Sequence, residues 1–394
     1  MVHFRYATEE QRALADDARK ILEKELKPQL EALEKADHGL GAYPMDVHQK
    51  MADAGYYAMN IPEELGGLNM DILTRTIIAE EMAQVDAGFT FAFTNLGNNC
   101  SAIWETSMPM EQKLDIAQRT MSGELKHCFC LTEADAGSDA AAMRTTAVKD
   151  GNEWVINGTK CFASGGPNAD YFIVAAWTDK TQRASKGVTV FVVEKERGVT
   201  IGKKENKMGL KTSETSEVVF DNVRVPEDHS VGEVGTGFVK ALSIISDEGR
   251  LTGLAYCLGL AQSAFDYALE YAKTRRQFGK RIIDHQAVGF MLADMEARTQ
   301  ACRAMLYEAV CCKRDGIDIG HTPNLLKTFI SDCTMQTTLD AVQVFGGYGY
   351  MKDYPVEKLM RDAKIFQIFS GTNQIQRKNA VTALAGRDPL LAKK

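Results

Sequence analysis

The chain has 394 residues, of which 45% are hydrophobic and 25% are charged, a composition typical of a folded globular protein with two or three packed layers or subdomains. Its formal net charge of −7 argues against a surface that follows the phosphates of a nucleic acid, because such surfaces concentrate Lys and Arg. The longest apolar stretch, around residues 251–265, is interrupted by Thr, Gln, Ser and Gly, so we expect no membrane span.

The first segment, residues 1–122, has helical periodicity. It opens with a capping box from Thr8 to Gln11 and continues with apolar residues at helical spacing until Pro28. This start leaves no room for a signal or transit peptide, so we expect a cytoplasmic, bacterial protein. A second helical pattern covers residues 80–99 and carries alternate aromatic and hydroxyl side chains, namely Phe89, Thr90, Phe91, Phe93 and Thr94.

Residues 123–233 change to short alternating runs that are typical of β-strands. The runs are separated by Gly, Asn and Asp turns and lie at residues 154–156, 171–174, 188–193 and 218–220. Helical patterns return after Gly237, and residues 251–269 are apolar nearly all round, as in a helix inside a bundle. We therefore expect an α+β protein with an N-terminal α-helical domain, a middle β-domain and a C-terminal α-helical bundle domain, at residues 1–122, 123–233 and 234–394.

Nine cysteines are scattered along the chain, and their spacing matches neither a zinc site nor a thioredoxin motif. We expect reduced, mostly buried thiols and no metal site.

Six motifs carry most of the functional information. Each is weak alone, since a Gly-rich loop after a strand can be an ordinary turn as well as a site for an anion or a polar ring edge. They are residues 131–139 (LTEADAGSD), 157–166 (NGTKCFASGG), 207–220 (KMGLKTSETSEVVF), 275–286 (RRQFGKRIIDHQ), 343–349 (QVFGGYG) with 361–365 (RDAKI), and 370–377 (SGTNQIQR).

In this order and at these intervals the motifs resemble the acyl-CoA dehydrogenase family, over essentially the whole chain. The resemblance implies the family's three-domain fold, an FAD held across a subunit boundary in a homotetramer, oxidation of a CH–CH bond in an acyl-CoA, and electron-transfer flavoprotein as electron acceptor. By position it implies cofactor contacts from Leu131, Thr132, Gly137, Ser138, Phe162, Ser164, Arg275, Gln277, Phe278, His285, Gln286, Gln343, Gly347, Thr372 and Gln374. It implies contacts with the CoA thioester from Ser138, Asp247 and Arg250.

The family's catalytic base is missing. Most relatives carry a Glu at the position of Ser370, and a minority carry it at the position of Gly249. A serine hydroxyl without an activating partner stays protonated at neutral pH and cannot replace a carboxylate. The backbone N–H of Ser370 could still polarise the thioester carbonyl.

Three hypotheses account for the missing base. In the first, another carboxylate reaches a different substrate carbon, and the candidates are Asp86 and Glu248. Asp86 could equally be a hydrogen-bonding residue at a helix start or between helices. A site without an α-base suits a substrate whose α-carbon carries no abstractable proton. Here the resemblance narrows to the cyclohex-1-ene-1-carboxyl-CoA dehydrogenases of anaerobic aromatic metabolism, which perform a 1,4-elimination. The Phe-rich helix at residues 89–94 would suit a flat alicyclic ring, although such side chains also pack in helical cores.

The second hypothesis is a change of chemistry, in which the protein resembles family members that lost the base and perform another reaction, such as desulfination. A displaced base in an ordinary short-chain, medium-chain or branched-chain dehydrogenase is a variant of the first hypothesis. In the third, the chain is a non-catalytic, flavin-stabilised binding or assembly protein, which the complete set of FAD positions disfavours.

Overall fold

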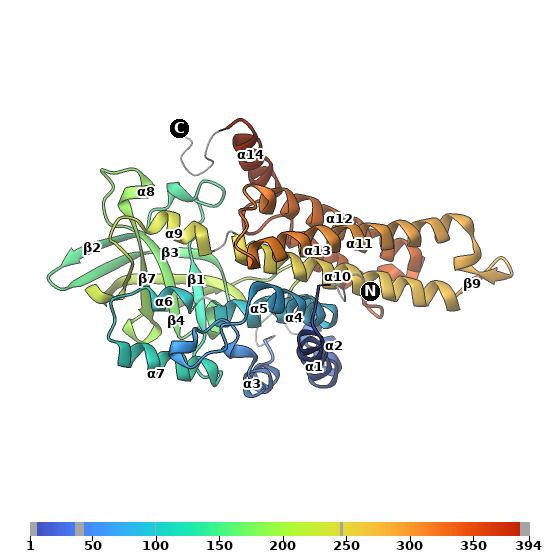
Figure 1. Cartoon of the computed structure of the whole chain (residues 1–394), viewed down its shortest axis with the longest axis horizontal. Helices are drawn as coiled ribbons and strands as arrows, with labels where there is room; N and C mark the ends of the chain where they lie inside the picture. The colour runs from blue at the N-terminus through green and yellow to red at the C-terminus, as the bar shows by residue number, and fades with distance from the viewer. Residues whose placement is uncertain (1–5, 36–42, 99, 245–246, 387–394) are drawn as a thin grey trace.

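The computed structural model describes residues 6–35, 43–98, 100–244 and 247–386, and of residues 98, 244, 247 and 248 only the backbone. A helical layer comes first, a β-sheet follows, and long helices complete the chain (Figure 1). The predicted α, β, α order is therefore confirmed. None of the described helices is long and apolar enough to cross a bilayer.

The N-terminal helices begin with the predicted capping box. Thr8 Oγ1 accepts the Gln11 N–H at 3.2 Å, and Gln11 Oε1 accepts the Thr8 N–H at 2.9 Å. The first helix ends at Glu25, ahead of Pro28. The helices of this layer are α1 (Glu9–Glu25), α2 (Leu30–Lys35), α3 (Met45–Asp53), α4 (Ile72–Val85), α5 (Ala87–Asn98), α6 (Ser101–Trp104) and α7 (Met110–Met121), with 3-10 helices η2 (Lys27–Gln29), η4 (Tyr56–Ala58) and η5 (Glu63–Leu65).

The single helix predicted for residues 80–99 is wrong. Helix α4 ends at Val85 and α5 begins at Ala87, with Asp86 between them in an extended conformation at φ −156°. The Asp86 carboxylate accepts the Phe89 N–H at 2.6 Å and so caps α5. Apolar residues continue on both sides of this junction, and the periodicity therefore hides it. Residue 99 lies outside the described part of the chain.

The middle of the chain forms one twisted sheet with the strand order β6-β7-β3-β2-β4-β5-β8, and β1 joins β4 in parallel. All the predicted strand runs lie inside it, in β3, β4, β5 and β7. Its strands are β1 (His127–Cys130), β2 (Thr146–Asp150), β3 (Glu153–Ser164), β4 (Tyr171–Trp177), β5 (Val188–Glu194), β6 (Thr200–Lys204), β7 (Thr215–Pro226) and β8 (Ser230–Val231). Short helices connect them, namely η6 (Ala140–Ala142), η7 (Gly166–Asn168), α8 (Ala184–Gly187), η8 (Lys195–Arg197) and η9 (Glu227–His229).

Both faces of this sheet are covered. Alternate residues of β4 point to opposite sides, so that Phe172 packs in one apolar cluster and Ile173 in another. The cluster around Ile173 includes residues of α6, α7 and α9. The strand reads as a continuous apolar run because it is buried on both sides.

The C-terminal part is a bundle of long helices. Its helices are α9 (Gly237–Ile244), α10 (Asp247–Thr274), α11 (Gln286–Arg314), α12 (Thr322–Phe345), α13 (Val356–Ile365) and α14 (Asn373–Leu384). A two-stranded hairpin of β9 (Arg276–Gln277) and β10 (Lys280–Arg281), with η10 (Ile282–Asp284), joins α10 to α11, and η11 (Gly346–Tyr350) follows α12.

Helix α10 packs closely against α4 of the N-terminal layer. At Gly259 a Cβ atom would lie 2.5 Å from the Glu80 carbonyl oxygen, so only glycine permits this approach. Glu80 also accepts hydrogen bonds from Arg303 and Tyr307 of α11, at 2.8 and 2.7 Å. The N- and C-terminal helices therefore share one core. All nine cysteines are free thiols, as expected.

Candidate active site

A cavity of about 610 Å³ lies where the three parts of the chain meet. Its walls come mainly from the N-terminal half of α10 and the segment between α13 and α14, with further residues from α4, α5, α9 and strand β1. Representative wall residues are Phe91, Phe129, Gly249, Tyr256, Phe369 and Ser370. Aromatic walls with a few placed polar groups are typical of a small-molecule site.

The segment that carries Ser370 is held in an unusual conformation. Ser370 has φ 52° and Gly371 has φ 83°, both in the left-handed region. The Gln376 side chain donates to the Ser370 carbonyl at 2.8 Å, and the Thr372 hydroxyl caps α14 by accepting the Ile375 N–H at 3.2 Å. These bonds fix the backbone of Ser370 at the cavity wall.

The predicted flavin positions of the middle domain lie around the loop after β1. The Thr132 carbonyl accepts the Cys161 N–H at 2.8 Å, which brings this loop beside Phe162 and Ser164 at the end of β3. Phe162 has φ 56°, and 63% of its surface is exposed. An exposed ring beside backbone groups and the exposed Gly137 and Ser138 is suited to a flat, polar-edged cofactor.

A buried ion pair holds this loop. Glu133 accepts the N–H groups of Arg144 and Thr145 at 2.6 and 3.0 Å and pairs with Lys160 at 2.8 Å. Burial would raise the pKa of the Glu133 carboxyl, but Lys160 and these hydrogen bonds outweigh it and hold the pKa below its usual value. The Lys160 ammonium also donates to the Leu131 carbonyl at 3.1 Å, so the flavin side of the loop is anchored to the sheet.

A second group of predicted cofactor residues lies elsewhere. Arg275, Gln277 and Gly347 line a separate cavity of about 440 Å³. The Arg275 guanidinium lies over the Tyr348 ring, 5.6 Å from its centroid. Nearby, His285 Nε2 lies 3.1 Å from the Gln277 carbonyl, Gln286 begins α11, and Phe278 on the hairpin is 94% exposed.

Figure 1 shows β9 at the end of the molecule opposite the sheet. Arg275 directly precedes β9, and Phe162 lies in β3 of the sheet, so the two belong to opposite ends of the chain. Gln343, near the end of α12, belongs to the Arg275 end, whereas Thr372 and Gln374 lie at the start of α14.

Of the predicted CoA contacts, Arg250 lines the main cavity and donates to Asn324 at 3.0 Å. Ser138 is exposed on the loop after β1 and is not among the cavity-lining residues. The side chain of Asp247 lies outside the described residues, as does that of Glu248.

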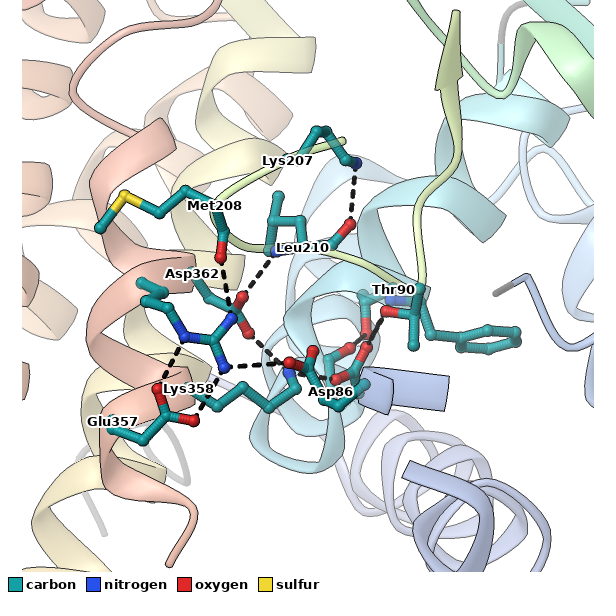
Figure 2. Close-up of polar contacts among 12 residues, drawn as sticks. Asp86, Thr90, Lys207, Met208, Leu210, Glu357, Lys358 and Asp362 are labelled. Atoms are coloured by element: carbon teal, nitrogen blue, oxygen red, sulfur yellow. Dashed lines mark hydrogen bonds and ion pairs between the residues drawn. The ribbon is translucent and has the colours of Figure 1, made fainter. Parts of the chain in front are cut away.

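Asp86 does not lie at the cavity. The residue is 2% exposed, and its carboxylate accepts the Phe89 N–H at 2.6 Å and the Thr212 hydroxyl at 2.5 Å. Lys358 donates to it at 2.7 Å and to Asp362 at 2.6 Å, so the ammonium lies between two buried carboxylates (Figure 2). This network joins the α4–α5 junction to α13.

Ionisation of Asp86 is governed by the same contacts. Burial would raise its pKa, but the charge of Lys358 and hydrogen bonds from Lys358, Thr212 and Phe89 outweigh burial and hold the pKa below its usual range. This carboxylate is not among the described residues that line the main cavity, and its partners are those of a structural residue. The structure thus favours the alternative weighed for Asp86, a hydrogen-bonding residue between helices, over a catalytic base.

Family models for the N-terminal, middle and C-terminal domains of acyl-CoA dehydrogenases match residues 8–124, 128–223 and 235–385. The chain belongs to the acyl-CoA dehydrogenase family. An acyl-CoA dehydrogenase of Bacillus subtilis is 39% identical to it over 94% of this chain and 97% of the relative. Subunit CarC of the caffeyl-CoA reductase–Etf complex of Acetobacterium woodii is 35% identical over 94% and 97%. The solved structure of butyryl-CoA dehydrogenase from Megasphaera elsdenii superposes with a TM-score of 0.89 at 37% identity, covering 96% and 99% of the two chains.

Family membership confirms the predicted fold, the FAD cofactor and the class of FAD-dependent dehydrogenases. The exposed Phe162 ring, beside the backbone groups of the loop after β1, fits the flat ring system of such a cofactor. In this acyl-CoA dehydrogenase, Leu131, Thr132, Phe162 and Ser164 would hold the ring system, where bound FAD supplies the hydride acceptor.

Both usual base positions of the family face the same cavity in this acyl-CoA dehydrogenase. Ser370 and Gly249 line it, and neither is a carboxylate. Among the described lining residues the one carboxylate is Glu105, which pairs with Lys240 of α9. The described walls therefore offer no uncommitted carboxylate to remove an α-proton.

The predicted Phe-rich pocket helix is only partly correct. Phe91 lines the cavity and lies 5.0 Å from Phe369 and 6.2 Å from Tyr256, between ring centroids. Phe89 and Phe93 point instead into the N-terminal core, where they stack on each other at 5.7 Å. One phenylalanine of the three belongs to the site.

The sequence interpretation missed several wall residues, above all Arg75 and Tyr256. A signal for Arg75 was present, because it is the one charged residue in the segment ILTRTIIA at 72–79, which otherwise reads as a buried helix. A lone cation in such a helix indicates either a buried ion pair or a functional cavity.

Proposed function

We propose that this dehydrogenase oxidises an alicyclic, α,β-unsaturated acyl-CoA by 1,4-elimination, with cyclohex-1-ene-1-carboxyl-CoA as the model substrate. The observation that carries the proposal is the absence of a carboxylate at both Ser370 and Gly249, although both residues line the cavity. A substrate whose α-carbon bears no removable proton does not need a base at either place.

The shape of the cavity supports a flat ring. Phe91, Phe366 and Phe369 form a connected aromatic wall, with ring centroids 5.0 Å apart for Phe91 and Phe369 and 5.1 Å apart for Phe366 and Phe369. Aromatic walls hold a flat ring in one orientation better than a flexible chain. We assign to the Ser370 N–H the polarisation of the thioester carbonyl, because a backbone donor does not depend on the side chain.

The 1,4-elimination still needs a proton acceptor on the remote carbon. Of the two carboxylates that the sequence offered, Asp86 is committed to Lys358 and Thr212. Glu248, one residue before Gly249, is the candidate that we retain.

Anaerobic mixing with two thioesters tests the proposal. Cyclohex-1-ene-1-carboxyl-CoA should bleach the flavin absorbance, whereas butyryl-CoA, which needs an α-base, should bleach it at least about 10²-fold more slowly. Glu248→Gln should slow bleaching by the ring substrate by about 10² or more. Glu227→Gln, which removes an exposed partner of Lys149, serves as control. Rapid bleaching by butyryl-CoA alone would overturn the proposal.

We further propose that two copies of the chain share each FAD in a homotetramer. Strand β9, which directly follows Arg275, lies at the end of the chain opposite the sheet, whose strand β3 carries Phe162. This supports the proposal, because a second copy could bring the two groups together. Electrons would then pass to an electron-transfer flavoprotein. The Etf complex of the Acetobacterium woodii relative supports that partner.

Arg275→Ala tests the shared site. The substitution should weaken FAD binding about tenfold to a hundredfold, the loss expected for one hydrogen bond to a charged group. The FAD-to-protein ratio after gel filtration measures it, with light scattering for the mass. Arg314→Ala, which removes an exposed partner of Asp315, is the control. If the Arg275→Ala variant is a monomer and still carries one FAD per chain, the proposal of a shared site is contradicted.

A further inference from the structure

The segment between α13 and α14 is a loop whose two ends are joined. The Asn373 N–H donates to the Gln367 carbonyl at 3.0 Å and so closes the loop. Ser370 lies in the middle of it, with φ 52° in the left-handed region. The direction in which the Ser370 N–H points therefore depends on how this loop is held.

One carboxylate of α12 binds both ends of the loop. The side-chain amides of Gln367 and Asn373 donate to the same oxygen, Oδ1 of Asp332, at 2.7 and 2.8 Å. The other oxygen of Asp332 accepts from Arg377, which is exposed, at 2.6 Å. Asn373 also donates to the buried hydroxyl of Ser331 at 2.9 Å. Because both ends bond to one atom of one helix, α12 fixes the distance between them.

A buried cation orients the Asn373 amide. Lys327 Nζ donates to Asn373 Oδ1 at 2.8 Å, and both residues are 3% exposed. The amide oxygen thus faces the ammonium, and the amide nitrogen faces the Asp332 carboxylate. A flipped amide would place its N–H groups against the ammonium and its oxygen against the carboxylate, so the two charges fix its orientation. Burial lowers the pKa of Lys327 to about 8, and the ammonium is therefore the main form at neutral pH.

These contacts place the loop relative to the cavity. Lys327 lines the same cavity as Ser370. The bonds from Gln376 to the Ser370 carbonyl and from Ile375 to the Thr372 hydroxyl join residues of the loop and α14, and they fix the local shape. The bonds to α12 tie that shape to a helix that itself forms part of the cavity wall.

We propose that Asn373, oriented by Lys327 and Asp332, is a positioning residue that directs the Ser370 N–H at the thioester carbonyl. The proposal rests on the role assigned to Ser370 above and adds α12 as the element that sets it. A backbone donor stabilises developing charge best when its position is fixed before the reaction. A serine in the left-handed region is strained, so the surrounding contacts must hold it there. None of the α12 contacts involves the Ser370 side chain.

The carbonyl vibration of a bound thioester tests the proposal. Benzoyl-CoA has a flat ring, no α-proton and no CH–CH bond to oxidise, so it can occupy the site without turnover. Its carbonyl stretch, isolated by ¹³C labelling and infrared difference spectroscopy, should move to lower wavenumber on binding to the flavin-loaded protein. Asn373→Ala should lose at least about half of this shift. Arg377→Ala is the matched control, since it removes an exposed partner of Asp332 and leaves both ends of the loop bonded.

The outcomes separate this proposal from the one on which it rests. If benzoyl-CoA perturbs the flavin spectrum of the unmodified protein but its carbonyl band does not move, the role assigned to Ser370 fails, and this proposal fails with it. If the band moves equally in the unmodified protein and in Asn373→Ala, the positioning role is overturned and the role of Ser370 stands. A residue that only stabilises the fold would lower Tm and leave the band of the bound thioester unchanged.

A second pair of variants covers the case in which Asn373→Ala does not fold. Asp332→Ala releases both ends of the loop and should lose the shift. Asp332→Asn keeps an acceptor oxygen for Gln367 and Asn373 and should retain it. An unchanged shift in Asp332→Ala would overturn the proposal.

Discussion

Flavin reduction by butyryl-CoA should become at least about 10²-fold faster when Ser370 is replaced by glutamate, because the variant regains an α-base at the cavity wall. The backbone there already has φ 52°, so serine and glutamate bear a similar conformational cost. Gln376 and the Thr372 cap hold this conformation through contacts that do not involve the residue 370 side chain. Stopped-flow absorbance under anaerobic conditions measures the rate.

Ser370→Gln is the matched control, since it has the size of glutamate and no basic oxygen. It should leave reduction by butyryl-CoA as slow as in the unmodified protein. The variant with glutamate should also lose activity toward cyclohex-1-ene-1-carboxyl-CoA, because the longer side chain occupies cavity space. No gain with butyryl-CoA in a flavin-loaded Ser370→Glu protein would mean that residue 370 does not face the substrate's α-carbon.

The second large effect concerns stability. Lys358→Ala should lower the free energy of unfolding by about 3–5 kcal/mol, since it leaves the buried carboxylates of Asp86 and Asp362 without their shared cation. Thermal unfolding followed by circular dichroism should show a Tm several degrees lower. Lys364→Ala, an exposed residue on the same helix, is the control and should change Tm little.

Asp86→Asn separates structure from catalysis. The folded variant should keep the full rate of flavin reduction, whereas a large loss of rate at unchanged flavin content would restore Asp86 as a catalytic residue.

The stability that Asp86 contributes should depend on pH. Its pKa is lowered in the folded state, so its contribution is fully present above the unfolded value of about 4 and is lost as the pH falls further. The difference in Tm between the unmodified protein and Asp86→Asn should therefore be largest near pH 7 and shrink toward pH 3. A difference that grows on acidification would contradict the lowered pKa.

Local sequence patterns predicted the elements whose side chains are all buried or whose contacts lie within a few residues of each other. The run from Val188 to Val193 has high β-propensity and forms a strand buried on both faces. The capping box at Thr8 is specified by residues three apart, and it formed as expected. In these places local preference and tertiary packing agree.

Sequence patterns did not predict the helix boundaries and side-chain directions that depend on packing between distant segments. The apolar run on either side of Asp86 hid a helix boundary, although Asp is a preferred N-cap residue and could have indicated it. Three phenylalanines of α5 looked equivalent, yet the turn of the helix sends Phe91 to the cavity and Phe89 and Phe93 to the core. The resemblance implied an FAD held across a subunit boundary, but the sequence alone could not show how far the hairpin at β9 lies from the sheet within one chain.

The Glu133–Lys160 pair has a consequence for how such a protein can change over generations. It holds the loop after β1 to the sheet through contacts inside the middle segment, whereas the cavity-lining residues Arg75, Phe91 and Tyr256 come from α4, α5 and α10. The loop with the predicted flavin positions and the residues that line the cavity are thus encoded in separate stretches of sequence. Substitutions in the cavity walls can therefore change the shape of the cavity without touching the ion pair that holds this loop.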